Sequence, residues 1–260
     1  MSEKRQNGSE ALLALSGFSK SFGPVDALKD VDLEVHRGEV VGLVGDNGAG
    51  KSTLIKAVAG VQPADSGEAR FEGRPVKLNT PQAATAIGIA TVYQDLALCE
   101  NLDVVANLFL GQEVSNGVLD ETSMEQKANE LLDSLGVTTL RSVRTDVERL
   151  SGGQRQAVAI ARSMLGDPNL AVLDEPTAAL GIVQTRQILD LIKRLKDRNI
   201  GVIVISHNLA DVFQVADRIV VLRLGRLAGE FDVAKSKREE IVAAITGADV
   251  DERATEEQPL

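Results

Sequence analysis

The sequence is poor in cysteine, in aromatic residues and in long apolar runs. Its one cysteine, Cys99, cannot form a disulfide within the chain, and we give it no catalytic role. Apolar stretches such as 202–205 are far shorter than the roughly 20 residues of a membrane-spanning helix, so we expect no passage through a bilayer. Residues 1–10 lack the apolar segment of a signal peptide. These absences favour a cytosolic protein.

Positive charge is also scarce. The chain has 28 Lys and Arg residues against 38 Asp and Glu residues, which gives a net charge of −10. Such a surface repels the phosphate backbone of DNA and RNA, so nucleic acid is not expected as a partner. The remaining composition is ordinary for 260 residues, with 43% hydrophobic and 25% charged residues. It predicts a folded protein with one elaborated domain.

Short apolar runs alternate with helical patterns along much of the chain. The runs at 40–44, 89–93, 170–173 and 200–205 are typical of buried strands in a parallel sheet. A helix connecting the last two strands is predicted by apolar residues on one face, namely Ile188, Leu189, Leu191, Ile192 and Leu195. This alternation predicts an α/β fold.

The stretch from about 96 to 165 breaks this alternation. It contains helical patterns at 103–110, 122–135 and 151–165 and no convincing strand, so we expect a helical subdomain inserted into the sheet domain. After His207, β character returns at 218–230, with Gly225 in a hairpin turn.

A glycine-rich segment between a predicted strand and a predicted helix matches the pattern G-x-x-x-x-G-K-[ST] of a phosphate-binding loop. It consists of Gly45, Asp46, Asn47, Gly48, Ala49, Gly50, Lys51 and Ser52, followed by Thr53. The glycines allow backbone N–H groups to converge on phosphate oxygens at a helix N-terminus. Lys51 can reach the β and γ phosphates, and Ser52 can ligate Mg²⁺. A lysine directly after the last glycine favours a triphosphate over a dinucleotide.

The strand at 170–173 ends in two carboxylates, Asp174 and Glu175, at the sheet edge where ligands bind. Asp174 can hold Mg²⁺, and Glu175 can orient and deprotonate a water that attacks the γ-phosphate. Taken alone, a strand that ends in a polar turn at Pro176 explains the pattern equally well. The phosphate-binding loop upstream favours the catalytic interpretation.

A second segment has the features of an anion site. Ser151, Gly152, Gly153 and Gln154 precede a predicted helix, with Ser151 suited to be its N-cap and the glycines leaving backbone N–H groups exposed. One nucleotide does not need two phosphate sites. In isolation, an ordinary helix cap with a flexible entry is the alternative interpretation.

In this order, the phosphate-binding loop, LSGGQ at 150–154 and LDEP at 173–176 resemble the ATP-binding subunit of an ATP-binding cassette (ABC) transporter. The resemblance covers residues from about 12 to 247. It implies a P-loop NTPase fold with a RecA-like core, an N-terminal antiparallel β subdomain and the inserted helical subdomain. A flexible tail at 1–11 and an acidic tail at 248–260 are expected to flank this single domain.

The resemblance also implies roles for further residues. Phe22 matches the aromatic residue that stacks on adenine, with a core residue as the alternative. Gln94 matches the glutamine of the loop that joins the catalytic core to the helical subdomain, which implies a role in catalysis and in binding ATP and Mg²⁺, with a polar residue at a strand end as the alternative. His207 matches the switch histidine, with a structural histidine as the alternative. The family loop after LDEP usually ends in Asp, whereas this chain has Gly181.

In this family two protomers sandwich two ATP molecules head to tail. The resemblance therefore implies a homodimer in the ATP-bound state, in which 151–154 of one protomer meet the γ-phosphate held by Lys51 of the other. It also implies integral-membrane permease subunits, indirectly a solute-binding protein, and a position on the inner face of the cell membrane. The segments GDNGAGKST, TVYQDLAL and EPTAALG are similar to the sugar-import branch for ribose, xylose and fructose.

We therefore predict an ATP-hydrolysing subunit that uses ATP and Mg²⁺ to power carbohydrate import. Two alternatives stay open, a soluble cassette ATPase outside transport and an ATP-gated regulatory module without turnover. The chain between Ser52 and Ser151 is too short for the long coiled coil of the chromosome-maintenance type. Glu175 and His207 favour turnover over gating.

Overall fold

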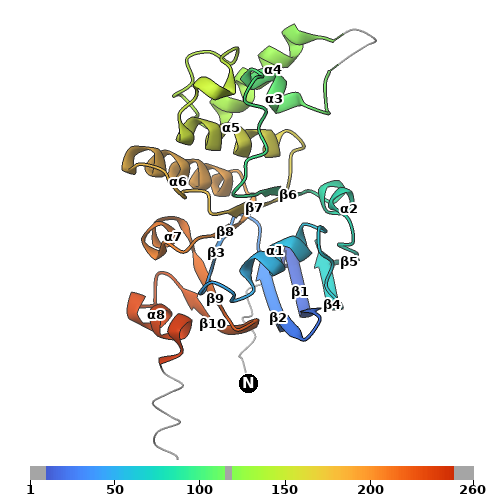
Figure 1. Cartoon of the computed structure of the whole chain (residues 1–260), viewed down its shortest axis with the longest axis vertical. Coiled ribbons are helices and arrows are strands. Elements are labelled where there is room, and N and C mark those ends of the chain that lie inside the picture. Colours follow the sequence, from blue (N-terminus) through green and yellow to red (C-terminus); the bar gives the residue numbers. More distant parts are fainter. Residues whose placement is uncertain (1–9, 115–118, 249–260) are drawn as a thin grey trace, which may run out of the picture.

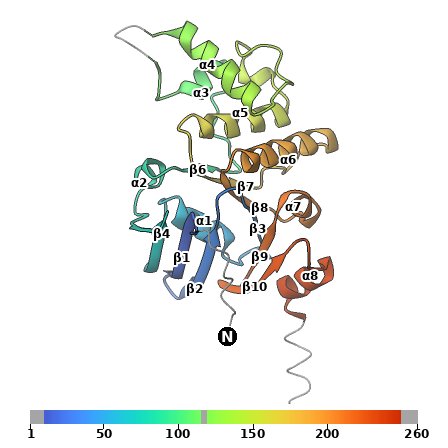
Figure 2. The ribbon, with the colours of Figure 1, turned by 180° about the vertical axis from the view of Figure 1, so that it is seen from behind.

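The computed structural model describes residues 10–114 and 119–248. The predicted tails at 1–11 and 248–260 lie outside these residues, apart from residues 10, 11 and 248. Two β-sheets occupy one end of the molecule and a layer of helices the other (Figures 1 and 2). The predicted α/β fold is confirmed.

The first sheet is antiparallel, as the resemblance implied. Its strand order is β2-β1-β4-β5. Its strands are β1 (Leu13–Phe22), β2 (Val25–Val35), β4 (Ser66–Phe71) and β5 (Arg74–Val76). Phe22 pairs with Val25 across the turn between β1 and β2. This pairing places Phe22 at the tip of a long hairpin.

The second sheet has six strands in the order β10-β9-β3-β8-β7-β6. Four of them are the predicted buried strands, β3 (Val40–Val44), β6 (Ile89–Val92), β7 (Leu170–Asp174) and β8 (Gly201–Ile205). All neighbouring pairs are parallel except β9 with β10. The carboxyl ends of β3, β7 and β8 therefore meet at one edge of the sheet.

The hairpin predicted around Gly225 is present. It joins β9 (Arg218–Arg223) to β10 (Arg226–Asp232). The two turn residues, Leu224 and Gly225, have φ values of 51° and 75°, as a two-residue hairpin turn with the twist of the strands requires.

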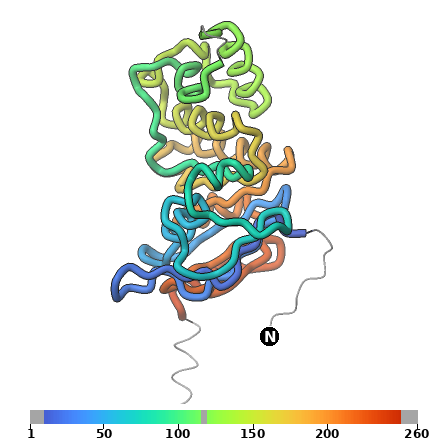
Figure 3. The backbone as a smooth tube through the Cα atoms, turned by 90° about the vertical axis from the view of Figure 1, so that its right-hand side faces the viewer, coloured from blue at the N-terminus to red at the C-terminus, as the bar shows by residue number. Residues whose placement is uncertain are grey.

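The helices predicted between β6 and β7 are present within one residue of their expected ends. They are α3 (Val104–Phe109), α4 (Glu121–Ser134) and α5 (Gly152–Met164), with a short 3-10 turn at Val147–Arg149. Seen from the side in Figure 3, they form a layer at the far end of the molecule from the antiparallel sheet. The described residues of 96–165 contain no strand, and an isolated bridge joins Asp103 to Asp146.

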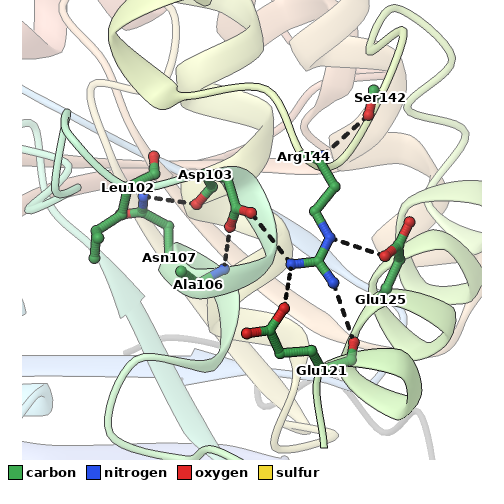
Figure 4. Close-up of polar contacts among 8 residues, drawn as sticks. All are labelled: Leu102, Asp103, Ala106, Asn107, Glu121, Glu125, Ser142 and Arg144. Atoms are coloured by element: carbon green, nitrogen blue, oxygen red, sulfur yellow. Dashed lines mark hydrogen bonds and ion pairs between the residues drawn. The ribbon is translucent and has the colours of Figure 1, made fainter.

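A cluster of charged side chains joins the parts of this helical layer (Figure 4). Arg144 Nε donates to Glu125 Oε2 at 2.8 Å, and its Nη1 donates to Glu121 Oε2 at 3.1 Å, both on α4. The same Nη1 lies 3.5 Å from Oδ2 of Asp103, whose other carboxylate oxygen caps α3 at Ala106. One arginine thus links the loop before α5 to both α3 and α4.

The predicted connecting helix is α6 (Ile182–Asp197), and its buried residues are Ile188, Leu189, Leu191, Ile192 and Leu195, as expected. A helix was also expected from near Gly50, and α1 (Lys51–Val58) lies there. Three helices were not predicted, α2 (Pro81–Ala86), α7 (Leu209–Val215) and α8 (Arg238–Thr246). In the described part of the chain, no helix has both the length and the apolar character that a bilayer span requires.

Candidate functional site

Four loops meet at the carboxyl edge of the parallel sheet and line a cleft of 610 Å³. The loops follow β3, β6, β7 and β8. The predicted site residues that line the cleft are Gly45, Asp46, Asn47, Gln94, Glu175 and His207. A second cleft of 470 Å³ shares Glu175 and His207 with the first and extends along α6 and α7. Topology thus brings together predicted site residues up to 162 positions apart, the separation between Gly45 and His207.

The three glycines after β3 are required for different structural reasons. Gly45, Gly48 and Gly50 have φ values of 147°, 80° and 105°, which L side chains rarely adopt. A Cβ on Gly45 would lie 2.1 Å from the Leu222 carbonyl oxygen, and one on Gly50 would lie 2.6 Å from that of Ala27. A Cβ on Gly48 would meet nothing within 4 Å. Gly48 therefore leaves space beside the loop, whereas the other two allow the loop to pack.

Lys51 is folded onto the same loop. Its Nζ donates to the carbonyl oxygens of Gly45 at 2.6 Å and Asp46 at 3.0 Å. Burial lowers the pKa of Lys51, against the opposite effect of the nearby carboxylates, of which Glu175 is the strongest. Helix α1 has no side-chain cap at Gly50. The ammonium group of Lys51 and the backbone N–H groups in the first turn of α1 are therefore both available to bind an anion.

Two adjacent carboxylates end β7. The pKa of Asp174 is raised by burial and by the neighbouring carboxylate of Glu175, while Lys51 opposes the shift. A half-buried pair of this kind favours a cation, and Mg²⁺ binds proteins through one or two carboxylates together with substrate phosphates. Among the described residues, no group of three or more His, Cys, Asp or Glu side chains could hold a metal. The Asp174 carboxylate suits a Mg²⁺ that takes most of its ligands from a nucleotide, and Ser52, in the first turn of α1, offers a hydroxyl oxygen of the same hard kind.

Glu175 and His207 lie in direct contact. The backbone N–H of His207 donates to Glu175 Oε1 at 3.1 Å, and its Nδ1 lies 2.9 Å from Oε2. The exposed fraction is 15% for the Glu175 side chain and 74% for that of His207. The carboxylate is thus enclosed, while the imidazole, which contacts it through Nδ1, is otherwise exposed and lines the cleft.

The other two residues whose roles come from the resemblance, Phe22 and Gln94, lie in different places. Phe22 is 45% exposed, and the Lys20 ammonium lies 5.6 Å from the centre of its ring. This exposure excludes the alternative of a core residue. Gln94 follows β6 and lines the 610 Å³ cleft with its side chain exposed.

The segment 151–154 caps α5. Ser151 Oγ accepts from Gln154 N at 3.3 Å, and Gln154 Oε1 accepts from Ser151 N at 2.9 Å, which is a capping box. A Cβ on Gly153 would lie 2.8 Å from Gln184 Cβ, so this glycine also allows α5 to approach α6. None of the residues 151–154 lines either cleft. Within one chain, the two predicted anion sites are therefore separate.

Some lining residues escaped the sequence analysis. Leu209 of α7 and Val242 and Ile245 of α8 line the cleft that contains the phosphate-binding loop. The helical spacing of Ile241, Val242 and Ile245 was the available signal for α8. Thr80 as N-cap, followed by Pro81, was the corresponding signal for α2.

Comparison with known proteins gives consistent matches. Residues 28–178 match the family described as ABC transporter. The chain is 44% identical, over 90% of its length and 94% of the relative, to the Xylose/arabinose import ATP-binding protein XylG of Sulfolobus acidocaldarius. It is 42% identical to the Fructose import ATP-binding protein FrcA of Rhizobium meliloti, over 92% of the chain and 95% of the relative. It is 38% identical to the Ribose import ATP-binding protein RbsA of Chromobacterium violaceum, over 93% of the chain but only 48% of the relative.

Solved structures with the same fold are also similar. The ADP conformation of MJ1267, an ATP-binding cassette of an ABC transporter, matches with a TM-score of 0.78 at 27% identity, covering 94% of this chain and 98% of that one. A dimeric post-hydrolysis state of the ATP-binding cassette MJ0796, bound to ADP and Pi, matches with a TM-score of 0.72 at 27% identity. The second match covers 85% of this chain and 98% of that one.

Proposed function

Since this chain belongs to the ABC transporter family, we propose that it is the ATP-hydrolysing subunit of a sugar importer. The observation that carries the proposal is the meeting of the phosphate-binding loop, Glu175 and His207 in one cleft. Binding and hydrolysis of a triphosphate need these three elements at one place. The relatives named for import of xylose, arabinose and fructose support a carbohydrate as the transported substrate.

Nucleotide binding is assigned to the loop after β3 and to the hairpin tip. Lys51 exchanges the carbonyl oxygens of Gly45 and Asp46 for the β and γ phosphates of ATP, because charged oxygens are stronger acceptors. The space beside Gly48 admits the phosphates to the backbone. Phe22 is exposed enough to stack on adenine. The remaining residues of this site are Asn47, Ala49, Gly50, Ser52 and Thr53.

Mg²⁺ is assigned to Ser52 and Asp174, with Gln94 at the edge of the cleft as the third protein group. When bound, the cation would neutralise charge on the phosphates. Asp174, whose pKa is raised by burial and then by Glu175, would be its carboxylate ligand. The hydroxyl, carboxylate and amide oxygens of these residues are hard ligands of the kind that Mg²⁺ prefers.

Hydrolysis is assigned to Glu175 as general base. Its carboxylate is enclosed and held by the backbone N–H of His207, so it can orient a water and accept its proton. The exposed imidazole of His207 is placed to hydrogen-bond the γ-phosphate. The position of both residues at one sheet edge supports these roles.

The segment 151–154 acts on the ATP of a second protomer. It lies outside both clefts of its own chain, so a cis contact with the nucleotide has no support. A Cβ on Gly152 would lie 3.2 Å from the Leu180 side chain, so this segment packs against the residues just before α6. There the exposed fractions of Ile182 and Val183 are 86% and 72%, an apolar pair suited to a partner surface. Gly181 brings no charge to this face.

The wider assembly is proposed from the relatives and the solved structures that this chain resembles. Import proteins matched over nearly their whole length support separate permease subunits and, indirectly, a solute-binding protein. The dimeric cassette MJ0796 supports a homodimer. RbsA of Chromobacterium violaceum is longer, and this chain matches only 48% of its sequence. Contact with the permease places the chain on the inner face of the cell membrane.

Mixing two inactive variants tests the trans arrangement. Lys51→Ala removes the phosphate-binding charge, and Ser151→Arg places bulk and like charge at the positive end of α5. Each homodimer then has two half-broken sites. In a mixed dimer one site carries both changes and the other is intact. Equal mixing makes about half the dimers mixed, so up to about a quarter of the wild-type sites return if sites are independent.

Nucleotide trapping in cross-linked mixed dimers is measured beside turnover, since cooperation between sites can hide recovered hydrolysis. Mixed dimers with neither trapping nor turnover contradict the trans model. The sugar assignment is tested separately, by ATP hydrolysis of the complex in proteoliposomes with and without candidate sugars and their binding protein. A complex that no pentose or hexose stimulates, but an unrelated solute does, contradicts carbohydrate import.

A further inference from the structure

Glu175 has a backbone conformation that L-residues rarely adopt. Its φ is 50°, and that of Ala179 in the same loop is 58°. The left-handed region is unfavourable for a residue with a Cβ. Such conformations persist only where the surrounding structure holds them in place. The contacts that hold this loop therefore decide where the Glu175 carboxylate lies.

The loop is attached to the rest of the fold on both sides of Pro176. On the first side, Glu175 N donates to the Ile205 carbonyl oxygen of β8 at 2.9 Å. On the second side, Thr177 Oγ1 donates to Asp211 Oδ2 of α7 at 2.8 Å. Thr177 and Asp211 are each only 8% exposed. This buried bond joins the loop of Glu175 to the helix that follows His207.

The other hydrogen bonds after Pro176 are local turns. Ala178 N donates to the Glu175 carbonyl oxygen at 3.1 Å, and Leu180 N donates to that of Thr177 at 3.3 Å. Turns of this kind move with the loop and do not fix it against the sheet. Among the described residues of this loop after Pro176, Thr177 is the one whose side chain forms a hydrogen bond with another element. No other side-chain donor bonds to Asp211 there.

We propose that Thr177 and Asp211 are positioning residues for hydrolysis: their buried hydrogen bond holds Glu175 in its strained conformation and in register with His207. This inference rests on the proposed role of Glu175 as the base. Without the bond, Glu175 can relax toward a common backbone conformation. A displacement of about 1 Å at a reacting group can reduce the rate about 100-fold. Nucleotide affinity is set by the loop after β3 and is left unchanged.

Four single variants and one double variant test the proposal. Thr177→Val keeps the shape and removes the donor, and Asp211→Leu removes the acceptor. Each is expected to lower kcat per bound nucleotide about 10- to 100-fold, with Kd for ATP unchanged. Thr177→Ser and Asp211→Asn keep the hydrogen bond and are expected to stay within about threefold of wild type. Thr91→Val is the matched control, because Thr91 is half-buried in β6 without a side-chain hydrogen bond among those described.

The double variant Thr177→Val/Asp211→Leu separates positioning from stability. Removing both partners leaves no unpaired polar group in the buried site, so its Tm is expected to recover relative to the single variants. Its kcat is expected to stay low, because Glu175 is still not held. A kcat that recovers together with Tm overturns the proposal, since the bond then acts through stability alone. Normal kcat per bound nucleotide in Thr177→Val overturns it directly.

Glu175→Gln separates this proposal from the proposed function. Normal hydrolysis by Glu175→Gln means that the base lies elsewhere and removes both. An inactive Glu175→Gln beside a fully active Thr177→Val or double variant leaves the function intact and overturns the positioning role alone. Inactive Glu175→Gln with slow Thr177→Val and rescue by Thr177→Ser supports both.

Discussion

Gly48 offers a substitution that separates folding from nucleotide binding. Its φ of 80° makes alanine strained there, at a cost of about 1–2 kcal/mol. A Cβ would meet nothing within 4 Å, so Gly48→Ala adds no clash. At about 2–4 °C per kcal/mol for a domain approaching this size, the Tm should fall by about 2–8 °C and the fold should survive.

The methyl group of Gly48→Ala projects into the space assigned to the phosphates, so Kd for ATP is expected to rise at least about tenfold. With wild type at an ATP concentration of 100 Kd, ATP stabilises the fold by about 2.7 kcal/mol. A tenfold weaker site reduces this gain to about 1.4 kcal/mol. Thermal melts of both proteins with and without ATP and Mg²⁺ measure the two effects in one experiment, and calorimetry gives Kd.

Gly45→Ala is the contrasting variant. Its Cβ would lie 2.1 Å from a backbone oxygen of Leu222, at a φ of 147°. Backbone strain of about 1–3 kcal/mol and overpacking of a similar size add up to about 2–6 kcal/mol of lost stability. If ATP raises the Tm of Gly48→Ala as much as that of wild type, the phosphates do not lie beside this glycine.

If the Tm of Gly45→Ala is no lower than that of Gly48→Ala, the packing argument for Gly45 is refuted.

Three further variants test other parts of the structure. At pH values above the raised pKa of Asp174, Asp174→Asn should increase the Tm of the nucleotide-free protein, because the fold disfavours the charged carboxylate. Below pH 3.8 the Tm should be unchanged, since the carboxyl group is then neutral in both the folded and the unfolded state. Mg²⁺-dependent hydrolysis should be lost. Glu175→Gln should bind ATP without hydrolysing it and so form an ATP-dependent dimer in size-exclusion chromatography. Adding Ile182→Arg should abolish this dimer, whereas the control Val61→Arg, which changes an exposed apolar residue outside the segments proposed to meet the partner, should not. Arg218→Met should cost about 3–5 kcal/mol in chemical denaturation, because it leaves the Glu39 carboxylate, 15% exposed, without its partner; an unchanged midpoint contradicts this.

The parallel sheet and its helices were predictable because their signals are local. A buried parallel strand such as β3 is a continuous apolar run, and its five residues are all buried. Helix ends are marked by caps within one turn, as with Asp103 at α3 and Ser151 at α5. Each signal needs only neighbouring residues, so a sequence reveals it directly.

The antiparallel sheet had to come from the resemblance, since its strands lack a clean alternation. The pairing of β1 with β2 has register shifts between Leu15 and Phe18, Phe18 and Lys20, and Lys20 and Ser21. Each shift moves the following side chains relative to the faces of the sheet. A period of two residues is therefore interrupted repeatedly within one strand. Pattern analysis cannot recover such a strand, although its ends are paired in the fold.

The same distinction divides the candidate site. Gly45, Lys51 and Glu175 could be identified from sequence because phosphate and base chemistry needs them directly after particular strands. The contacts that position them join distant residues: Glu175 meets His207 32 positions away, and Thr177 meets Asp211 34 positions away. Neither pair has a local signal, since each depends on β7 and β8 being neighbours in the sheet. The reacting groups are thus local features of the chain, whereas their alignment is a property of the sheet order.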